Sequence, residues 1–135
     1  MFKMELDFDI SKFTRGLNLE NREIRKLTVK ALTKMTDVAK KSAKEFVPYK
    51  TGRLEKSIVS QVYKRKRIGV IRVNRGRKAS KYAVYIHDDM SYNLGEGSLR
   101  KRARLGVRVD RGYLSRAVFK NRRRFKKIIK RTMRR

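Results

Sequence analysis

Apolar and polar residues alternate along the first ten positions of the chain. The apolar side chains occupy every second position, at Phe2, Met4, Leu6, Phe8 and Ile10. A period of two that persists over ten residues predicts a strand with one buried face. The other face carries the acidic residues Glu5, Asp7 and Asp9.

The period lengthens to that of a helix over about residues 19–46. Apolar and small side chains recur at steps of three and four, at Ile24, Leu27, Ala31, Met35, Val38, Ser42 and Phe46, and Leu32, Ala39 and Ala43 widen this stripe. This spacing places them on one side of an amphipathic helix about 40 Å long. Pro48 marks the end of the helix, because proline cannot continue the helical hydrogen bonds.

Short runs rich in Ile, Val and Tyr follow this helix. The runs at 58–63 and 68–73 flank four consecutive basic residues, and this arrangement predicts a hairpin with a basic tip. A third strand is expected at 82–87. Residues 88–110 show little periodicity and predict a long loop, in which Val107 and Val109 could form a short fourth strand.

A second amphipathic helix is expected near the C-terminus. Its apolar positions are Leu114, Ala117, Val118, Phe125, Ile128 and Ile129, and its other face is almost entirely Arg and Lys. The order of elements predicts an α+β domain, in which an antiparallel sheet of about four strands packs against the long helix and the C-terminal helix. Residues 1–130 are expected to form this single domain, and 131–135 a basic tail.

The charge of the chain is large and uneven. The 135 residues include 40 Lys and Arg against 12 Asp and Glu, for a net charge of +28. Residues 1–60 hold 14 basic and 8 acidic side chains, whereas 61–135 hold 26 and 4, so the second part carries +22 of the charge. Such a field attracts polyanions, which leaves nucleic acid, acidic protein and an anionic membrane surface as candidate partners.

Four basic segments are the candidates for polyanion contact. They lie at the hairpin tip, in the loop after the hairpin, in the predicted long loop and on the last helix: Arg65, Lys66, Arg67, Arg75, Arg77, Lys78, Arg100, Lys101, Arg102, Arg104, Arg122, Arg123, Arg124, Lys126 and Lys127. The chain has no zinc-finger spacing, no basic region joined to a zipper and no aromatic pair typical of RNA-binding sheets. Any contact with DNA is therefore expected to involve the backbone and not the base sequence.

Catalysis has little support in the sequence. The chain has no cysteine and one histidine, so a Cys-based or all-histidine metal site within one chain is excluded. A metal-dependent nuclease centred on His87, Asp88, Asp89 and Glu96 is the distant alternative, because consecutive residues in an extended segment point to opposite faces. We expect no enzymatic activity and no cofactor.

No apolar run approaches the roughly 20 residues that cross a bilayer, and the N-terminus does not resemble a secretory signal. We therefore expect a soluble chain without a membrane partner.

Two segments resemble a known family. The sequences VPYKTGRLEKSI at 47–58, after the long helix, and YAVYIH at 82–87 resemble the two signature segments of the neck, or tail-completion, proteins of long-tailed bacteriophages. GYLSRA at 112–117 resembles the closing helix of that family. The residues that carry the resemblance are Pro48, Thr51, Gly52, Leu54, Ser57, Tyr82, Ala83, Tyr85, Leu114 and Ala117.

The resemblance covers about residues 19–129 and has functional implications. It implies a non-enzymatic structural protein of the virion neck, made in the host cytoplasm, that joins the head connector to the tail. It also implies a homo-oligomeric ring, commonly a hexamer, around the channel through which double-stranded DNA leaves. The alternative is a small basic nucleic-acid-binding protein of architectural type, for which the composition alone speaks equally well.

Overall fold

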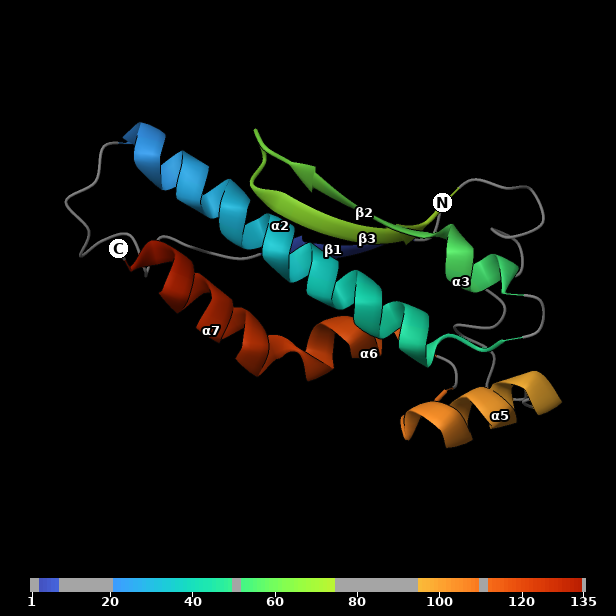
Figure 1. Cartoon of the computed structure of the whole chain (residues 1–135). Helices are drawn as coiled ribbons and strands as arrows, with labels where there is room; N and C mark the ends of the chain where they lie inside the picture. The colour runs from blue at the N-terminus through green and yellow to red at the C-terminus, as the bar shows by residue number, and fades with distance from the viewer. Residues whose placement is uncertain (1–2, 8–20, 50–51, 75–94, 110–111, 135) are drawn as a thin grey trace.

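The computed structural model describes residues 3–7, 21–49, 52–74, 95–109 and 112–134. Strands and helices follow one another along these residues (Figure 1). In chain order they are β1 (Lys3–Asp7), α2 (Asn21–Phe46), α3 (Arg53–Ser57), β2 (Ile58–Tyr63), β3 (Ile68–Val73), α5 (Glu96–Leu105), α6 (Tyr113–Lys120) and α7 (Arg122–Met133).

The described strands form one antiparallel sheet in the order β1-β3-β2. Val70, near the centre of β3, pairs with Glu5 of β1 on one side and with Gln61 of β2 on the other. The middle position explains the apolar sequence of β3, since Val70, Ile71 and Val73 are buried. The connection between β2 and β3 is the basic turn that the sequence predicts.

Helix α2 forms the centre of the molecule. It packs against β2 and β3 on one side and against α6 and α7 on the other, and Figure 1 shows it between these two layers. Two threonines lie on its buried face, and each hydroxyl donates to a carbonyl one turn earlier: Thr28 to Ile24 at 2.7 Å and Thr36 to Leu32 at 3.0 Å. These bonds satisfy the buried hydroxyls, so polar residues do not interrupt the packed stripe.

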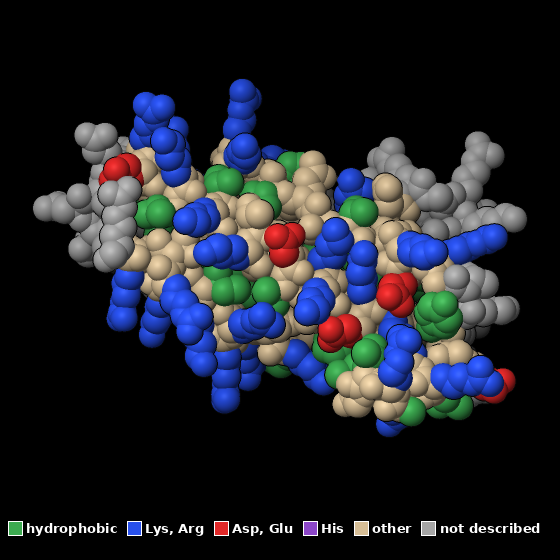
Figure 2. Space-filling view, viewed as in Figure 1, with side chains coloured by type: hydrophobic (Ala, Val, Ile, Leu, Met, Phe, Trp, Pro, Cys, Tyr) green, Lys and Arg blue, Asp and Glu red, His purple; other side chains and the backbone are tan. Residues whose placement is uncertain are grey.

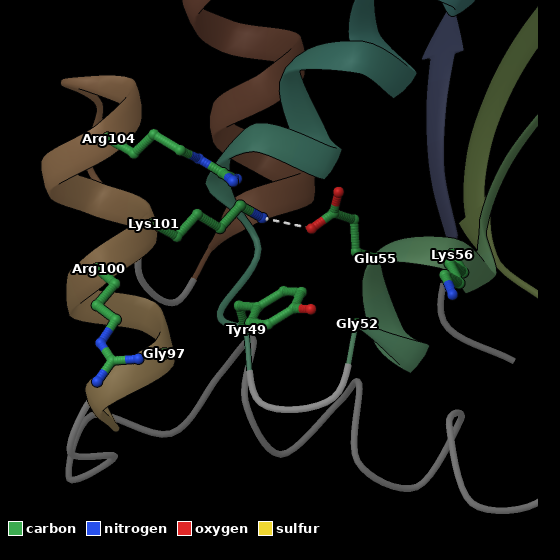
Figure 3. Close-up of a pocket in the computed structure, with 8 residues that line it drawn as sticks. All are labelled: Tyr49, Gly52, Glu55, Lys56, Gly97, Arg100, Lys101 and Arg104. Atoms are coloured by element: carbon green, nitrogen blue, oxygen red, sulfur yellow. Dashed lines mark hydrogen bonds and ion pairs between the residues drawn. The ribbon is translucent and has the colours of Figure 1, made fainter.

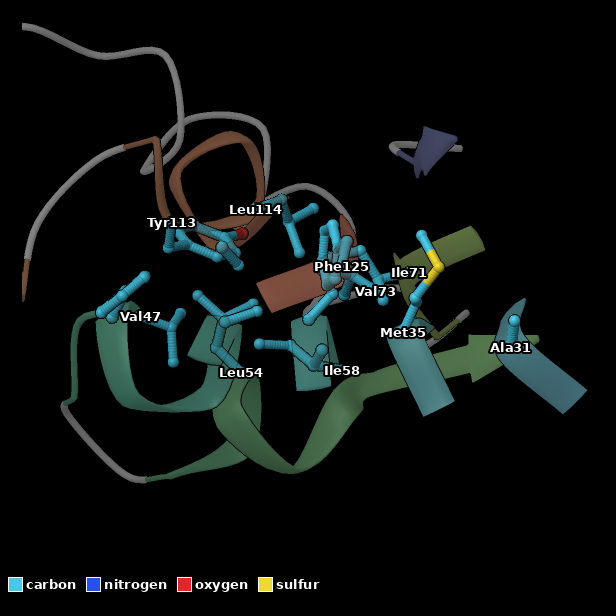
Figure 4. Close-up of a cluster of buried hydrophobic side chains, with 14 of the residues drawn as sticks. Ala31, Met35, Val47, Leu54, Ile58, Ile71, Val73, Tyr113, Leu114 and Phe125 are labelled. Atoms are coloured by element: carbon cyan, nitrogen blue, oxygen red, sulfur yellow. The ribbon is translucent and has the colours of Figure 1, made fainter. Parts of the chain in front are cut away.

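A hydrophobic cluster joins these layers. Ala31, Met35, Ala39, Ala43 and Phe46 of α2 enter it, as the helical period predicts. The other layers contribute Val47, Leu54, Ile58, Ile71, Val73, Tyr113, Leu114, Ala117, Phe125, Ile129 and Met133. The labelled members converge on one interior in Figure 4. None of the described helices is long and apolar enough to cross a membrane.

The predicted α+β class and antiparallel sheet are confirmed, but four strands are not. The described part of the sheet has three. Val107 and Val109 form no strand, because they lie in the irregular segment that leads to α6, where Val109 is buried and Val107 packs against the core. The predicted strand at 82–87 lies outside the described residues.

The predicted long loop contains a helix. Helix α5 occupies Glu96–Leu105 and ends at Gly106, whose φ of 63° gives the left-handed conformation that commonly terminates helices. The buried residues of α5 are Ser98 and Lys101. The sequence pattern missed the helix because its inward face is polar and has no apolar period.

The single C-terminal helix of the sequence analysis is two helices. Asn121, with φ −89° and ψ 3°, separates α6 from α7. Its side-chain nitrogen donates to the Ala117 carbonyl at 2.7 Å and to the Ser42 hydroxyl of α2 at 2.8 Å. Helix α7 then continues to Met133, with Thr132 and Met133 buried, so the tail predicted from residue 131 begins later.

Candidate polyanion-binding surface

A basic groove runs between α2 and the C-terminal helices. Nine residues line it: Lys34, Asp37, Val38, Lys120, Arg123, Arg124, Lys127, Ile128 and Arg131. Six of them are cations and one is an anion, so the α2–α7 groove, as we call it, has a strongly positive lining.

The sequence of α7 places this basic row beside the core. Phe125, Ile129 and Met133 recur every four residues and are buried. Arg123, Lys127 and Arg131 recur with the same step, and each comes two positions before one of these buried residues. They therefore form a neighbouring stripe on the surface of the helix. Packing of the apolar stripe against α2 thus turns the basic stripe toward the exposed side of α2.

Among the described residues, no acidic side chain forms an ion pair with a cation of the groove. Arg123, Arg124, Lys127 and Arg131 are exposed, and the ion pairs formed within the described part of the chain involve only Arg100 with Glu96 and Lys101 with Glu55. Closely spaced like charges repel one another. A bound polyanion would therefore relieve a repulsion that the fold itself creates.

A second groove lies on the opposite side of α2, at the hairpin tip. Its lining comprises Arg25, Lys26, Val29, Lys64, Arg65 and Arg67. Figure 2 shows Lys and Arg side chains projecting at the hairpin end and along the α7 edge of the same view, with few acidic side chains between them. The two grooves therefore flank the exposed side of α2.

Arg67 adopts a left-handed backbone conformation in the hairpin turn, with φ 54°. This conformation is uncommon for a residue with a side chain. It closes the turn so that Lys64, Arg65 and Arg67 face the first half of α2. Lys66 is exposed in the turn but does not line the groove.

Lys101 differs from the other predicted contact residues because it is buried. Its side chain is 4% exposed, and Nζ donates to Glu55 Oε2 and to the Val47 carbonyl at 2.9 Å each, and to the Lys44 carbonyl. Lys44 and Val47 lie at the C-terminal end of α2, where carbonyls lack helical partners. Lys101 thus caps α2 and binds α3 (Figure 3), so it is not available to an external polyanion in this structure.

Other contacts fasten α5 at the same place. The Ser98 hydroxyl accepts from the Tyr49 backbone nitrogen at 2.8 Å and donates to the Tyr49 carbonyl at 3.2 Å. A Cβ on Gly97 would lie 2.7 Å from that carbonyl oxygen, so the close approach requires glycine. We call Gly97, Ser98 and Lys101 with their partners the α5 latch.

The remaining predicted cations lie in different surroundings in the structure. Arg100 pairs with Glu96, Arg102 and Arg104 are exposed on α5, and the Arg122 guanidinium lies 4.5 Å from the ring centre of Phe119. Lys126 is exposed on α7 outside the groove. Arg75, Arg77 and Lys78 lie outside the described residues.

Sequence reasoning missed five groove residues, Arg25, Lys26, Lys34, Lys120 and Arg131. Arg25, Lys26 and Lys34 come before the strongly basic part of the chain, and Arg131 was assigned to the C-terminal tail. Lys120 and Arg131 could have been found from the sequence, because they continue the steps of three and four that connect the basic residues of the C-terminal helices. The contribution of α2 required the tertiary structure.

The described residues contain no group of three His, Cys, Asp or Glu side chains that could hold a metal ion. The His87, Asp88 and Asp89 group considered for nuclease chemistry lies outside them.

Comparison with protein families gives a match over residues 11–88, which is more than half of the chain, to the family described as "Bacteriophage HK97-gp10, putative tail-component". The chain belongs to this HK97-gp10-like family. No curated protein and no solved structure gives a match. The recognition of a phage neck or tail-completion family from the sequence is thereby confirmed.

The residues that carried this recognition have structural roles in the HK97-gp10-like chain. Pro48, Leu54, Leu114 and Ala117 are buried. Gly52 precedes α3 with φ 75°, and the Ser57 hydroxyl donates to the Leu54 carbonyl at 2.6 Å. Thr51, Tyr82, Ala83 and Tyr85 lie outside the described residues.

Membership in a family of phage tail components assigns the chain a structural role in the virion. Its partners in that role are other structural proteins of the phage. The matched region ends at residue 88, before α5, α6 and α7. The basic row of α7 therefore lies beyond the part of the chain that the family match covers.

Proposed function

We propose that this protein is a non-enzymatic ring subunit of the phage neck, which joins the head connector to the tail and flanks the DNA channel. The proposal rests on the family and, above all, on the two basic grooves along α2. The two basic grooves flank α2 on opposite sides, and their cations form no ion pair with an acid among the described residues, which favours a polyanion beside this helix. The genome in transit is the polyanion nearest to a neck protein.

Ring formation requires a source of negative charge that offsets the repulsion between subunits. Six copies of a chain with a net charge of +28 repel one another. We therefore expect the isolated chain to be monomeric at low ionic strength. Duplex DNA or an acidic neighbouring ring should supply the counter-charge that permits assembly.

Imaging of the phage particle tests this proposal most directly. We expect density for α2, the sheet and α6–α7 between portal and tail tube, repeated around the axis, with the grooves turned toward the channel or an adjacent ring. Density confined to the tail tube or baseplate, or one copy per particle, would overturn it. Absence from the particle together with DNA binding by the free chain would support the architectural alternative.

Mass measurement of the purified chain provides a second test. Raising the salt concentration from 50 mM to 500 mM should shift the chain from monomer toward ring, because screening shortens the range of repulsion. The same shift should occur at low salt when a short duplex is added. A chain that stays monomeric under both conditions, and in the presence of its neighbouring neck proteins, contradicts ring assembly.

A further inference from the structure

We infer that the α2–α7 groove is a binding site for the phosphate backbone of duplex DNA. The inference deepens the proposed function, on which it rests for the choice of duplex DNA as the polyanion. It goes further by naming one groove, its contact residues and a backbone mode of recognition.

The basic row of α7 is long enough to meet more than one phosphate. From Arg123 to Arg131 the axis of α7 advances about 12 Å at 1.5 Å per residue. Four cations of α7 line the groove over this length: Arg123, Arg124, Lys127 and Arg131. Because the phosphates of one DNA strand follow a helical path around the duplex, the row can contact a short segment of that strand.

The other wall of the groove also carries cations. Lys34 of α2 faces the groove from the other side, and Lys120 lies at its α6 end. Cations on both walls can contact both free oxygens of a phosphate, and three of the six are arginines, whose planar guanidinium binds phosphate through two parallel hydrogen bonds. The geometry therefore favours a row of backbone phosphates over a single anion.

The groove is poorly suited to a protein partner. Its apolar lining consists of Val38 and Ile128, both already partly buried against the core. Protein interfaces usually depend on aromatic or large apolar anchors in desolvated pockets, and the lining offers none. Contacts to phosphate oxygens fix the register and orientation of a protein on the duplex and carry no base sequence information.

Asp37 is the one acid in this lining. A carboxylate beside the phosphate path opposes binding by like-charge repulsion. Its replacement by asparagine keeps the shape of the side chain and removes the charge. DNA affinity should therefore increase in Asp37→Asn, an effect that misfolding cannot imitate.

The central experiment measures binding of the full-length chain to a fluorescent 20-base-pair duplex over a salt series. Arg123→Gln with Lys127→Gln removes two groove cations, whereas Lys126→Gln with Lys130→Gln removes two exposed cations of the same helix, at the same spacing, that do not line the groove. Each phosphate contact contributes about 0.9 to the slope of log affinity against log salt. The groove pair should lower that slope by about 1.8, and the matched pair should change it by less than half as much.

Several results would overturn the inference. Equal losses of slope for the two pairs would mean diffuse attraction without a site. Unchanged or weaker DNA binding by Asp37→Asn would show that the DNA phosphates do not lie beside Asp37 in the groove. Polyglutamate of equal charge that competes as well as the duplex, with the same dependence on Arg123 and Lys127, would assign the groove to an acidic protein.

Failure here is distinguishable from failure of the proposed function. Neck density in the particle with no DNA binding by the groove would overturn only this inference. DNA binding through the groove by a chain that is absent from the neck would overturn the proposed function and leave the groove assignment standing.

Discussion

Lys101 Nζ of α5 and Glu55 Oε2 of α3 lie 2.9 Å apart and join two residues that are 46 positions apart in the sequence. The lysine is almost fully buried, while the glutamate side chain retains 34% exposure. The same ammonium group satisfies the Val47 and Lys44 carbonyls at the end of α2. One residue of a highly basic chain thus serves the fold, and the exposed cations around it remain available to partners.

Replacement of Lys101 by methionine should destabilise the protein by about 2 kcal/mol. The change keeps the apolar stem but leaves carbonyls and a carboxylate without their donor, and the partial exposure of Glu55 limits the penalty. Chemical denaturation measures the effect. Arg102→Met, which removes an exposed charge from the same helix, should change stability by less than about 0.5 kcal/mol; a similar loss in both variants contradicts the role of the α5 latch.

Gly97→Ala should detach α5 from the end of α2. Alanine normally stabilises a helix by up to about 1 kcal/mol relative to glycine, but here the added Cβ would lie 2.7 Å from the Tyr49 carbonyl oxygen. Amide hydrogen exchange should show faster exchange throughout Glu96–Leu105.

Gly95→Ala is the matched control for this change. A Cβ at Gly95 meets nothing within 4 Å among the described residues, and its φ of −73° is ordinary for alanine. Exchange in α5 should stay unchanged in this variant. Unaltered exchange in Gly97→Ala as well would show that the close approach to Tyr49 does not hold α5 in place.

Thr132→Val should stabilise the protein by about 1 kcal/mol. The Thr132 hydroxyl oxygen is buried and has no hydrogen-bond partner among the described residues, and an unsatisfied buried hydroxyl costs free energy that a methyl group of similar size does not. Thermal unfolding should show a higher midpoint. Thr33→Val replaces an exposed hydroxyl that bonds the Val29 carbonyl at 2.8 Å, and it should bring no gain.

Ile129→Ala should destabilise the protein by about 3 kcal/mol, since the side chain is fully buried between α7 and the core and its loss leaves a cavity. Leu99→Ala, at a position 50% exposed on α5, should cost less than about 1 kcal/mol. Urea unfolding compares the two. Nearly equal midpoints would indicate that α7 is not packed as described.

The strongest sequence predictions depended on periodicity. The steps of three and four from Leu27 to Phe46 predicted α2 and most of its buried face, and runs rich in Ile, Val and Tyr on either side of a basic turn predicted β2 and β3. These signals are local, because a helix or hairpin must place every third, fourth or second residue on its buried side. The predicted strand at 82–87 remains a prediction.

The errors arose where polar residues took structural roles. Helix α5 buries Ser98 and Lys101, so no apolar stripe identified it, and Lys101 was taken for a surface cation. The break at Asn121 was missed because the side chain that stabilises it bonds Ser42 of α2, 79 residues away. Such partners are set by packing and leave no local pattern.

The sequence by itself determined the net charge of +28, its concentration after residue 60, the helical period of α2, the apolar runs of β2 and β3 around a basic turn, and the motifs that carry the family resemblance. Only the tertiary structure decided which cations share a groove, since Lys34 and Lys127 come together through the packing of α7 on α2. It also decided which cation is withdrawn from solvent, since Lys101 is buried only where it meets unpaired carbonyls and Glu55. Charge is a property of composition, whereas a binding surface depends on the distances between charges, and those distances are set by the packed core.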